Sequence, residues 1–407
     1  MIPKIAIPYI RLVAGNGGVL VMRLSLIAGI SHALPDQEAA NFLYLYSTAM
    51  VLALASDFGM RSWIFIEVGR SGGITVEMAE RLFHCRRLFG TITFILTSMW
   101  ALIYFSSDGF AAVELVSATL FGLFAATTPA ADLSMQILIG QGRAMREAVA
   151  RATEFFAVAL LLGLAVLSGL DARLMIGCWV LAAMLRGAWA RRAAFPERRP
   201  RRLLPSPAVA VSVARRNIAG WLLVLINTLA MRYVILLGPL VLEARDFLLL
   251  TLGLMTVQVG QVVSSSIAFQ VFGSDPDVRY SRAHDRLVAA CLGLGSAMGA
   301  GFWLLRDLAD IVLDARFAAA PAATAIVALC FPLLIVNDYL KYVFVQGNNM
   351  RHIIFAMLII AVVGSIFMLA LGPEYGLLGV LGIYIAGQIA QFLFSMIVLP
   401  RTLPRSL

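Results

Sequence analysis

Charged side chains are scarce in this chain: they make up 14% of its 407 residues, whereas hydrophobic residues make up 61%. A soluble globular protein carries about 25% charged residues, so the composition excludes that class and indicates an integral membrane protein. The short alternation of apolar and polar residues that marks the strands of a membrane barrel is missing. Apolar runs of about twenty residues, long enough to cross a bilayer as helices, recur along the whole length instead.

Patterns for metal ligation and disulfide bonding are also missing. The four cysteines are widely separated and form no CxxC pair: Cys85, Cys178, Cys291 and Cys330. They predict neither a zinc site nor a disulfide framework, and we interpret them as small apolar fillers. The four histidines lie near predicted loops: His32, His84, His284 and His352. We therefore expect no metal site, no cofactor and no catalytic residues.

Breaking the apolar runs at clusters of charged residues, Gly and Pro predicts twelve membrane-spanning helices. They cover residues 9 to 30, 39 to 63, 88 to 105, 111 to 139, 153 to 169, 174 to 190, 217 to 240, 247 to 272, 287 to 305, 321 to 346, 353 to 371 and 376 to 398. The first run follows basic residues, as a signal peptide does, but no small-x-small cleavage site follows it, so it is expected to be a permanent helix.

The distribution of basic residues over the loops predicts the orientation. With the N-terminus in the cytoplasm, 24 of the 32 Lys and Arg residues are assigned to cytoplasmic segments and four to outer loops. The cytoplasmic group includes Arg86 as well as Arg61 and Arg186, which lie at the cytoplasmic ends of their spans. The remaining four lie within spans: Arg11, Arg23, Arg232 and Lys341. By the positive-inside rule, both termini are cytoplasmic. Retention in the cytoplasm and attraction to anionic lipids explain the net charge of +9, so no nucleic-acid partner is expected.

The densest basic stretch, from Arg191 to Arg216, contains four prolines and lies near the middle of the chain. It indicates a linker between two six-helix halves. We predict an all-α membrane protein with two pseudo-symmetric bundles around a central cavity. The boundaries are a first bundle at 1–195, a cytoplasmic linker at 196–216, a second bundle at 217–400 and a cytoplasmic tail at 401–407.

The helices that open the two halves resemble each other. The segment "LVMRLSLIAG", Leu20 to Gly29, aligns without gaps with "LAMRYVILLG", Leu229 to Gly238, and makes Arg23 equivalent to Arg232. At about 1.5 Å per residue, each arginine lies roughly 20 Å from the cytoplasmic edge. An arginine at the centre of a membrane helix costs about 2.5 to 3.5 kcal/mol, and snorkelling lowers this cost nearer the interface. Its repetition favours a shared cavity, and snorkelling or pairing with an acid is the structural alternative.

Other polar residues interrupt the spans at helical spacing. Asn16 lies on the same face as Arg23, and further stripes pair Asp132 with Gln136 and Gln388 with Gln391. A stripe in the eighth span comprises Gln258, Gln261 and Ser265. Each stripe lines a cavity in one interpretation and hydrogen-bonds neighbouring helices in the other.

Acidic residues in or beside the spans are few. Asp338 and Lys341, at i and i+3, are close enough for an intrahelical ion pair. Asp57 and Glu154 are expected near the cytoplasmic interface. We regard Asp57, Asp132 and Asp338 as candidate proton or sodium sites. The candidate substrate-binding residues are Arg23, Arg232, Lys341, Asn16, Gln258 and Gln261.

Two motifs carry a family resemblance. After the second span stand "SDFGMR" and "EVGR", and the turn between the last two spans reads "GPEYGLLGVLG", Gly372 to Gly382. With twelve helices in two halves, the chain resembles polysaccharide flippases of the O-antigen type in the multidrug/oligosaccharidyl-lipid/polysaccharide (MOP) exporter superfamily. The outer loops are shorter than in that family, so they identify no element of sugar specificity.

The resemblance implies a protein of the bacterial inner membrane that flips an undecaprenyl-diphosphate-linked oligosaccharide outward by alternating access, beside polysaccharide polymerase or assembly proteins. It also implies a basic cavity, a role that Arg23 and Arg232 match in position and charge. A lipid II flippase and a drug antiporter are the alternatives within the superfamily, and the basic cavity disfavours the second. A membrane-embedded polymerase or ligase would need a larger outer loop than residues 306–320. A major-facilitator transporter would carry a Gly-x-x-x-Asp-Arg element after its second helix, and this sequence lacks that element there.

Overall fold

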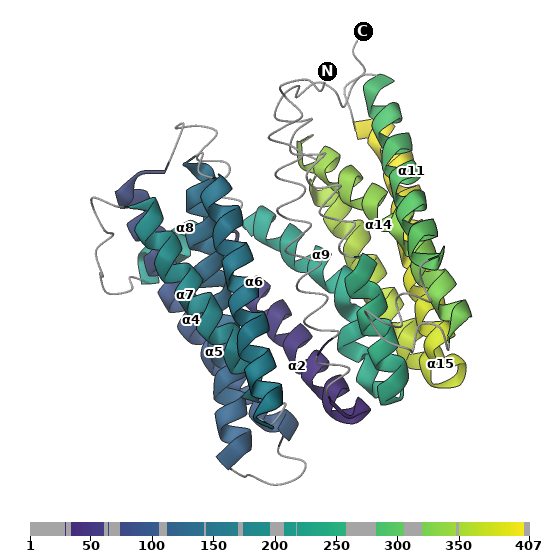
Figure 1. Cartoon of the computed structure of the whole chain (residues 1–407). Coiled ribbons are helices and arrows are strands. Elements are labelled where there is room, and N and C mark those ends of the chain that lie inside the picture. The colour runs from purple at the N-terminus through teal and green to yellow at the C-terminus, as the bar shows by residue number, and fades with distance from the viewer. Residues whose placement is uncertain are drawn as a thin grey trace, which may run out of the picture. The chain divides into compact units, whose positions relative to one another are not determined.

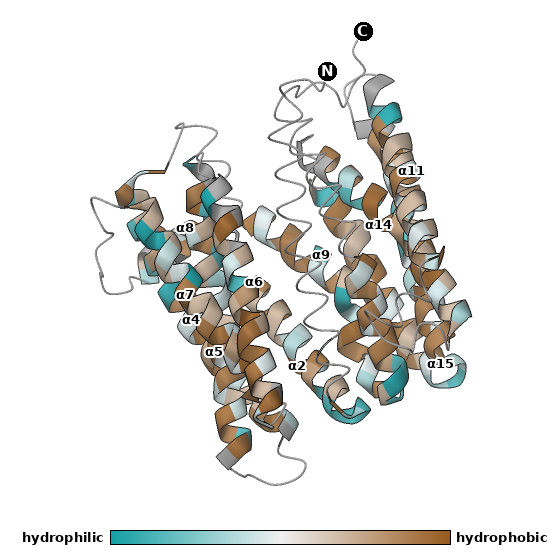
Figure 2. Cartoon of the chain, in the orientation of Figure 1, coloured by the Kyte–Doolittle hydropathy of each residue, from teal (hydrophilic) through white to brown (hydrophobic). Residues whose placement is uncertain are grey.

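The computed structural model describes residues 29, 34–60, 64, 74–105, 112–141, 144–169, 174–195, 207–216, 218–257, 282–304, 320–346 and 350–402. Within these ranges the regular secondary structure is helical and contains no strand (Figure 1). Seven of the described helices are long and apolar enough to cross a membrane. Brown, apolar residues dominate these helices in Figure 2. The all-helical membrane class predicted from composition is confirmed.

Residue contacts divide the chain into two units. Unit 1 comprises Met1–Leu43 and Leu229–Leu407, and unit 2 comprises Tyr44–Thr228. The boundaries fall inside two helices, α2 (Asp36–Ala55) and α9 (Ile218–Leu237). Most of the first predicted span lies outside the described residues, so the predicted halves at 1–195 and 217–400 stay a prediction.

In unit 2, α5 lies between α4 and α7, and α6 packs against α7 (Figure 1). The helices are α4 (Val76–Phe105), α5 (Ala112–Gly140), α6 (Ala144–Leu167), α7 (Ile176–Ala194) and α8 (Pro207–Arg216). The ring of Tyr46, on α2, lies 5.3 Å from that of Phe124 and 5.8 Å from that of Trp179. Aromatic rings at these separations attract each other beyond their apolar burial, so this group holds α2, α5 and α7 together.

The second predicted span ends earlier than expected, at Ala55 instead of residue 63. The chain turns at Phe58 and Gly59, where φ is 45° and 73°. A left-handed backbone is costly for a residue with a side chain, but the Phe58 ring stacks on Phe89 at 4.0 Å and on Trp221 at 5.0 Å. Tertiary packing therefore ends this helix inside an apolar run.

Helix α4 begins twelve residues before the predicted start, because Thr75 caps it by accepting a hydrogen bond from the Met78 N–H at 3.3 Å. The extension carries Arg86, expected in a cytoplasmic loop, into the buried core. Its guanidinium donates to the Ser56 carbonyl at 2.9 Å and to the Ala126 carbonyl at 3.3 Å. Arg86 thus binds the C-terminal end of α2 to α5, close to Pro129, which supplies no N–H to the α5 ladder.

Unit 1 contains the end of α9, a 3₁₀ turn η3 (Gly238–Leu240), helical residues 244–257, and three longer helices. The longer helices are α11 (Arg282–Leu304), α14 (Pro321–Gln346) and α15 (Met350–Thr402). Helix α14 has the predicted bounds and packs against both α11 and α15. At Gly376, φ is 55° and ψ is −145°, which breaks α15 into two limbs where a break between spans is predicted.

Candidate functional site

Helix α9 carries three consecutive buried residues in the interior of unit 1: Met231, Arg232 and Tyr233. Arg232 is 7% exposed, although the helix around it is almost wholly apolar. Transferring a guanidinium out of water is costly, so an arginine here is retained for a structural or functional reason. The placement confirms that Arg232 lies within a span and is buried in the protein.

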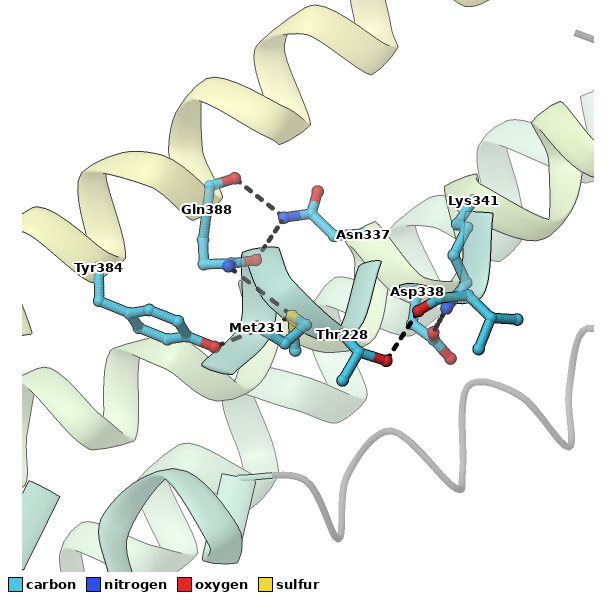
Figure 3. Close-up of polar contacts among 8 residues, drawn as sticks. Thr228, Met231, Asn337, Asp338, Lys341, Tyr384 and Gln388 are labelled. Carbon is cyan, nitrogen blue, oxygen red and sulfur yellow. Dashed lines mark hydrogen bonds and ion pairs between the residues drawn. The ribbon is translucent and has the colours of Figure 1, made fainter. Parts of the chain in front are cut away.

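Two amide side chains meet beside this segment (Figure 3). The Asn337 Nδ2, on α14, donates to the Gln388 main-chain carbonyl at 2.9 Å and to the Gln388 Oε1 at 3.1 Å. The Gln388 amide and the Tyr384 hydroxyl, both on α15, each lie 3.9 Å from the Met231 sulfur. Arg232 lies within electrostatic range of the same Tyr384 hydroxyl.

These five residues, Met231, Arg232, Asn337, Tyr384 and Gln388, form what we call the α9–α14–α15 polar cluster. The sequence stripe of Gln388 and Gln391 pointed to it, and both glutamines are buried. Asn337 and Tyr384 were not predicted. An asparagine four residues before Lys341 in an apolar span was the available signal. The Asn337 Oδ1 has no hydrogen-bond partner within the part of the chain that the structure describes, so a buried acceptor remains available there.

The predicted ion pair between Asp338 and Lys341 is confirmed (Figure 3). It lies on α14 and begins at the residue that follows Asn337. Its side chains are 7% and 14% exposed, so the pair is buried within unit 1. On the neighbouring residue, the Tyr339 hydroxyl lies 3.2 Å from the His284 Nδ1 and links α14 to α11. Lys341, a candidate substrate ligand, therefore has an acidic partner on its own helix.

A double-mutant cycle tests whether this pair is structural. We expect Asp338→Asn to lower stability more than the double change Asp338→Asn with Lys341→Met, because the single change leaves a partly buried ammonium without its carboxylate. The coupling should be about 0.5–3 kcal/mol, the range for residues in contact. It would be measured by thermal unfolding in detergent. Additive losses would contradict a stabilising pair.

Unit 2 contains a second group of buried charges. The Arg186 guanidinium, on α7, lies 2.9 Å from an Asp132 carboxylate oxygen on α5 and 3.1 Å from a Glu154 oxygen on α6. The Arg186 and Glu154 side chains are 5% and 8% exposed. Sequence analysis placed Glu154 near the interface and Arg186 in a cytoplasmic segment, whereas the structure buries both side chains in the protein and puts Arg186 inside α7. Their mutual pairing offsets the cost of removing both charges from water.

Of the remaining candidates, Asp57 is 2% exposed and therefore buried in unit 2, and its expected place near the cytoplasmic interface stays a prediction. It follows α2 at the Phe58 turn, and packing of that turn buries it. Arg23, Asn16, Gln258 and Gln261 lie outside the described residues. The structure thus places Gln388 against Met231, the residue before Arg232, and Arg232 within electrostatic range of Tyr384. It places Asp132 and Asp338 in separate ion pairs.

Metal ligation has no support in the described ranges, where no group of three His, Cys, Asp or Glu side chains could hold an ion. The four cysteines are free, and all except Cys178 are buried. The described helices therefore belong to a multi-pass helical membrane protein. Its ionisable residues inside apolar helices are buried in the protein, as is usual for charged groups in membrane spans.

Comparison with solved structures identifies the fold. An inward-facing multidrug resistance MATE family transporter of the MOP superfamily matches with a TM-score of 0.72 and 14% identity, covering 98% of this chain and 96% of that one. An outward-facing conformation of such a transporter matches at 0.68 and 14%, over the same shares. A MOP superfamily transporter from Pyrococcus furiosus matches at 0.64 and 13%, over 97% and 95%. This chain therefore has the twelve-helix fold of MATE transporters.

No family model matches the chain, and neither does any curated protein. The fold is the one seen in solved transporters of the superfamily that the sequence motifs resemble.

Proposed function

We propose that this chain is an alternating-access exporter. Its fold is similar to MATE transporters in both an inward-facing and an outward-facing conformation, over 98% of its length in each case. Such a pair of conformations is the basis of alternating access in membrane transporters built from two repeats. The fold similarity supports the transport class only, so the proposed substrate depends on the chemistry of the buried residues.

The substrate we propose is an undecaprenyl-diphosphate-linked oligosaccharide, moved from the cytoplasmic to the outer leaflet for surface polysaccharide biosynthesis. The observation that carries this proposal is Arg232, a buried guanidinium in the α9–α14–α15 polar cluster. A guanidinium binds phosphate through paired donors, and the amides of Asn337 and Gln388 suit sugar hydroxyls. Arg23, Asn16, Lys341, Gln258 and Gln261 are proposed to complete the site.

Pocket polarity is one property in which transporters of this fold differ. The Pyrococcus furiosus transporter is described as having a binding pocket of reverse polarity, which suggests a different function for it. A basic pocket in the present chain would likewise favour an anionic substrate over the cationic compounds that suit an acidic one.

The second candidate is an exporter of small molecules, with a lipid II flippase as a further option. The multidrug resistance transporters among the structural neighbours favour the first of these. Asp132 and Asp338 could serve ion coupling in either case, and Asp57 is the third candidate. The positive charge of Arg232 would repel a cationic drug, which disfavours such a compound as the substrate.

The proposed site of action is a bacterial inner membrane, with both termini in the cytoplasm and membrane lipids around the helices. Polysaccharide polymerase or assembly proteins are the proposed protein partners. Nucleic acid is not among them.

Reconstitution of the full chain tests the function. Vesicles containing the protein and a glycan-labelled lipid-linked oligosaccharide should expose the label to a membrane-impermeant lectin faster than empty vesicles do. The same vesicles should not concentrate a lipophilic cationic dye under a proton or sodium gradient. Dye transport without glycan exposure would overturn the flippase proposal in favour of the small-molecule exporter.

A further inference from the structure

The C-terminal end of α2 is held by side chains from two distant helices. The Trp221 indole N–H, near the start of α9, donates to the Ala55 carbonyl at 2.6 Å. Arg86 of α4 donates to the next carbonyl, that of Ser56, at 2.9 Å. The last four carbonyls of a helix have no partner within the helix. Trp221 therefore caps α2 from another element of the same unit, because Ala55 and Trp221 both belong to unit 2.

The same indole ring supports a strained turn. Phe58 has a φ of 45°, and a left-handed backbone is costly for a residue with a side chain. The Phe58 ring stacks on Trp221 at 5.0 Å, with 12° between the ring planes, and on Phe89 at 4.0 Å, with 25°. Strained residues persist where their surroundings hold them, and they gather at switch regions. The strain at Phe58 is therefore maintained in part by Trp221.

The contact that Trp221 makes is local. The Trp221 side chain is half-buried, whereas Ile218 and Ala219, just before it, are exposed, Ile218 by 54%. The first turn of α9 is thus not embedded in the core of unit 2. The hydrogen bond and the ring stack of Trp221 can break without opening that core.

Helix α9 joins this contact to the proposed anion-binding residue. By residue contacts, α9 belongs to unit 2 up to Thr228 and to unit 1 from Leu229. No Gly or Pro, the residues that most often kink a helix, lies between Trp221 and Leu237. From Trp221 to Arg232 the rise along the helix is roughly 16 Å, at about 1.5 Å per residue. A movement of α9 at Trp221 is therefore transmitted to the polar cluster.

We propose that Trp221 is a conformational latch of the transport cycle, an inference that rests on the proposed alternating-access function. In the closed state the latch has the contacts of the present structure and fastens the start of α9 to the end of α2. In the open state the indole leaves both contacts, and Phe58 relaxes from its left-handed backbone. The strain released at Phe58 offsets the lost hydrogen bond and ring stack. Two states must be close in free energy for both to be populated, and this offset keeps them so.

The distance between two spin labels tests the latch. The full chain carries labels at Ile218→Cys, on α9, and at Arg81→Cys, on α4, where both native side chains are exposed. Cys178, the cysteine that is not buried, is replaced by Ala so that it takes no label. Double electron–electron resonance is recorded on the protein in lipid vesicles. A closed and an open latch should give two distances, whose populations report the equilibrium between them.

Substitutions at Trp221 should shift these populations. Trp221→Phe keeps a ring that can stack on Phe58 but loses the N–H, and the loss of one typical hydrogen bond should raise the ratio of open to closed latch about two- to tenfold. Trp221→Ala removes both contacts and should leave the closed distance below detection. The matched control is Trp189→Phe on α7, where the native side chain is 42% exposed, and it should leave the ratio unchanged.

A purely structural cap would give a different pattern. Trp221→Phe would then lower the unfolding temperature while one unchanged distance persists in the parent and in every variant. That result would overturn the latch, and so would a shift of equal size in Trp189→Phe.

The failure of the latch is distinguishable from that of the proposed function, because the labels report the latch without any substrate. Two distances that respond to Trp221→Phe, in a protein that exposes no glycan in the vesicle assay, would reject the flippase and keep the latch. Glycan exposure by a protein with one unchanged distance would reject the latch alone.

Discussion

Replacing Arg232 by Ala is expected to abolish flipping of the lipid-linked oligosaccharide while the protein still inserts and folds. The change removes a buried charge from an apolar helix, which relieves a desolvation cost. It also removes the proposed donor to the diphosphate. A hydrogen bond to a charged group contributes about 1.5–3 kcal/mol, so affinity should fall by about 10- to 150-fold. The measurement is glycan exposure in the reconstituted vesicles, with thermal unfolding recorded on the same sample.

Two companion variants sharpen this result. Arg232→Lys keeps the charge but loses the planar pair of donors, so a large loss in this variant would indicate bidentate binding. Arg245→Ala removes an exposed arginine from the same unit and should leave transport unchanged. The sequence repeat predicts the same loss for Arg23→Ala. Normal transport in both Arg232→Ala and Arg23→Ala would reject a role of these residues in anion binding.

Replacing Arg186 by Gln is expected to be the most destabilising single change in unit 2. It leaves the carboxylates of Asp132 and Glu154 in the protein interior without the guanidinium that both of them contact. Removing one partner of a buried ion pair costs about 3–5 kcal/mol. The loss would be measured as a lower unfolding temperature in detergent, or as lower yield of folded protein in the membrane.

The matched control for this change is Arg192→Gln, in the last turn of the same helix, where the side chain is exposed. Its effect should stay within about 0.5 kcal/mol. A neutral triad made by Arg186→Met, Asp132→Asn and Glu154→Gln should recover most of the stability, because replacing a whole buried ion cluster is often close to neutral. A stable Arg186→Gln protein would show that the triad does not hold α5, α6 and α7 together.

Local sequence signals located several elements well. The bounds of α14 match the predicted span, and the break of α15 at Gly376 falls where the Gly-Pro-x-Tyr-Gly turn indicated. The Asp338–Lys341 pair also followed from its i, i+3 spacing. Each of these features depends on residues within one or two helical turns of each other, so periodicity and turn chemistry were sufficient to predict them.

The elements that the sequence misplaced depend on distant partners. Helix α2 stops inside an apolar run because Phe58 packs between Phe89 and Trp221. Arg86 is buried because it finds carbonyl acceptors 30 and 40 residues away. A charge next to an apolar run suggests a loop, and only its partners reveal that the helix continues through it.

By itself, the sequence determined the membrane class, the helical secondary structure and the unusual position of an arginine in the span that opens the second half. Those properties depend on composition and spacing, because a bilayer requires long apolar helices and makes each deep charge costly. The tertiary structure decided which polar groups meet. It joined Asn337 to Gln388 beside Met231, gave Arg186 its two carboxylates, and packed Tyr233 against Gly364 of α15. These contacts join helices that are distant in the chain, and their geometry follows from how whole helix faces pack.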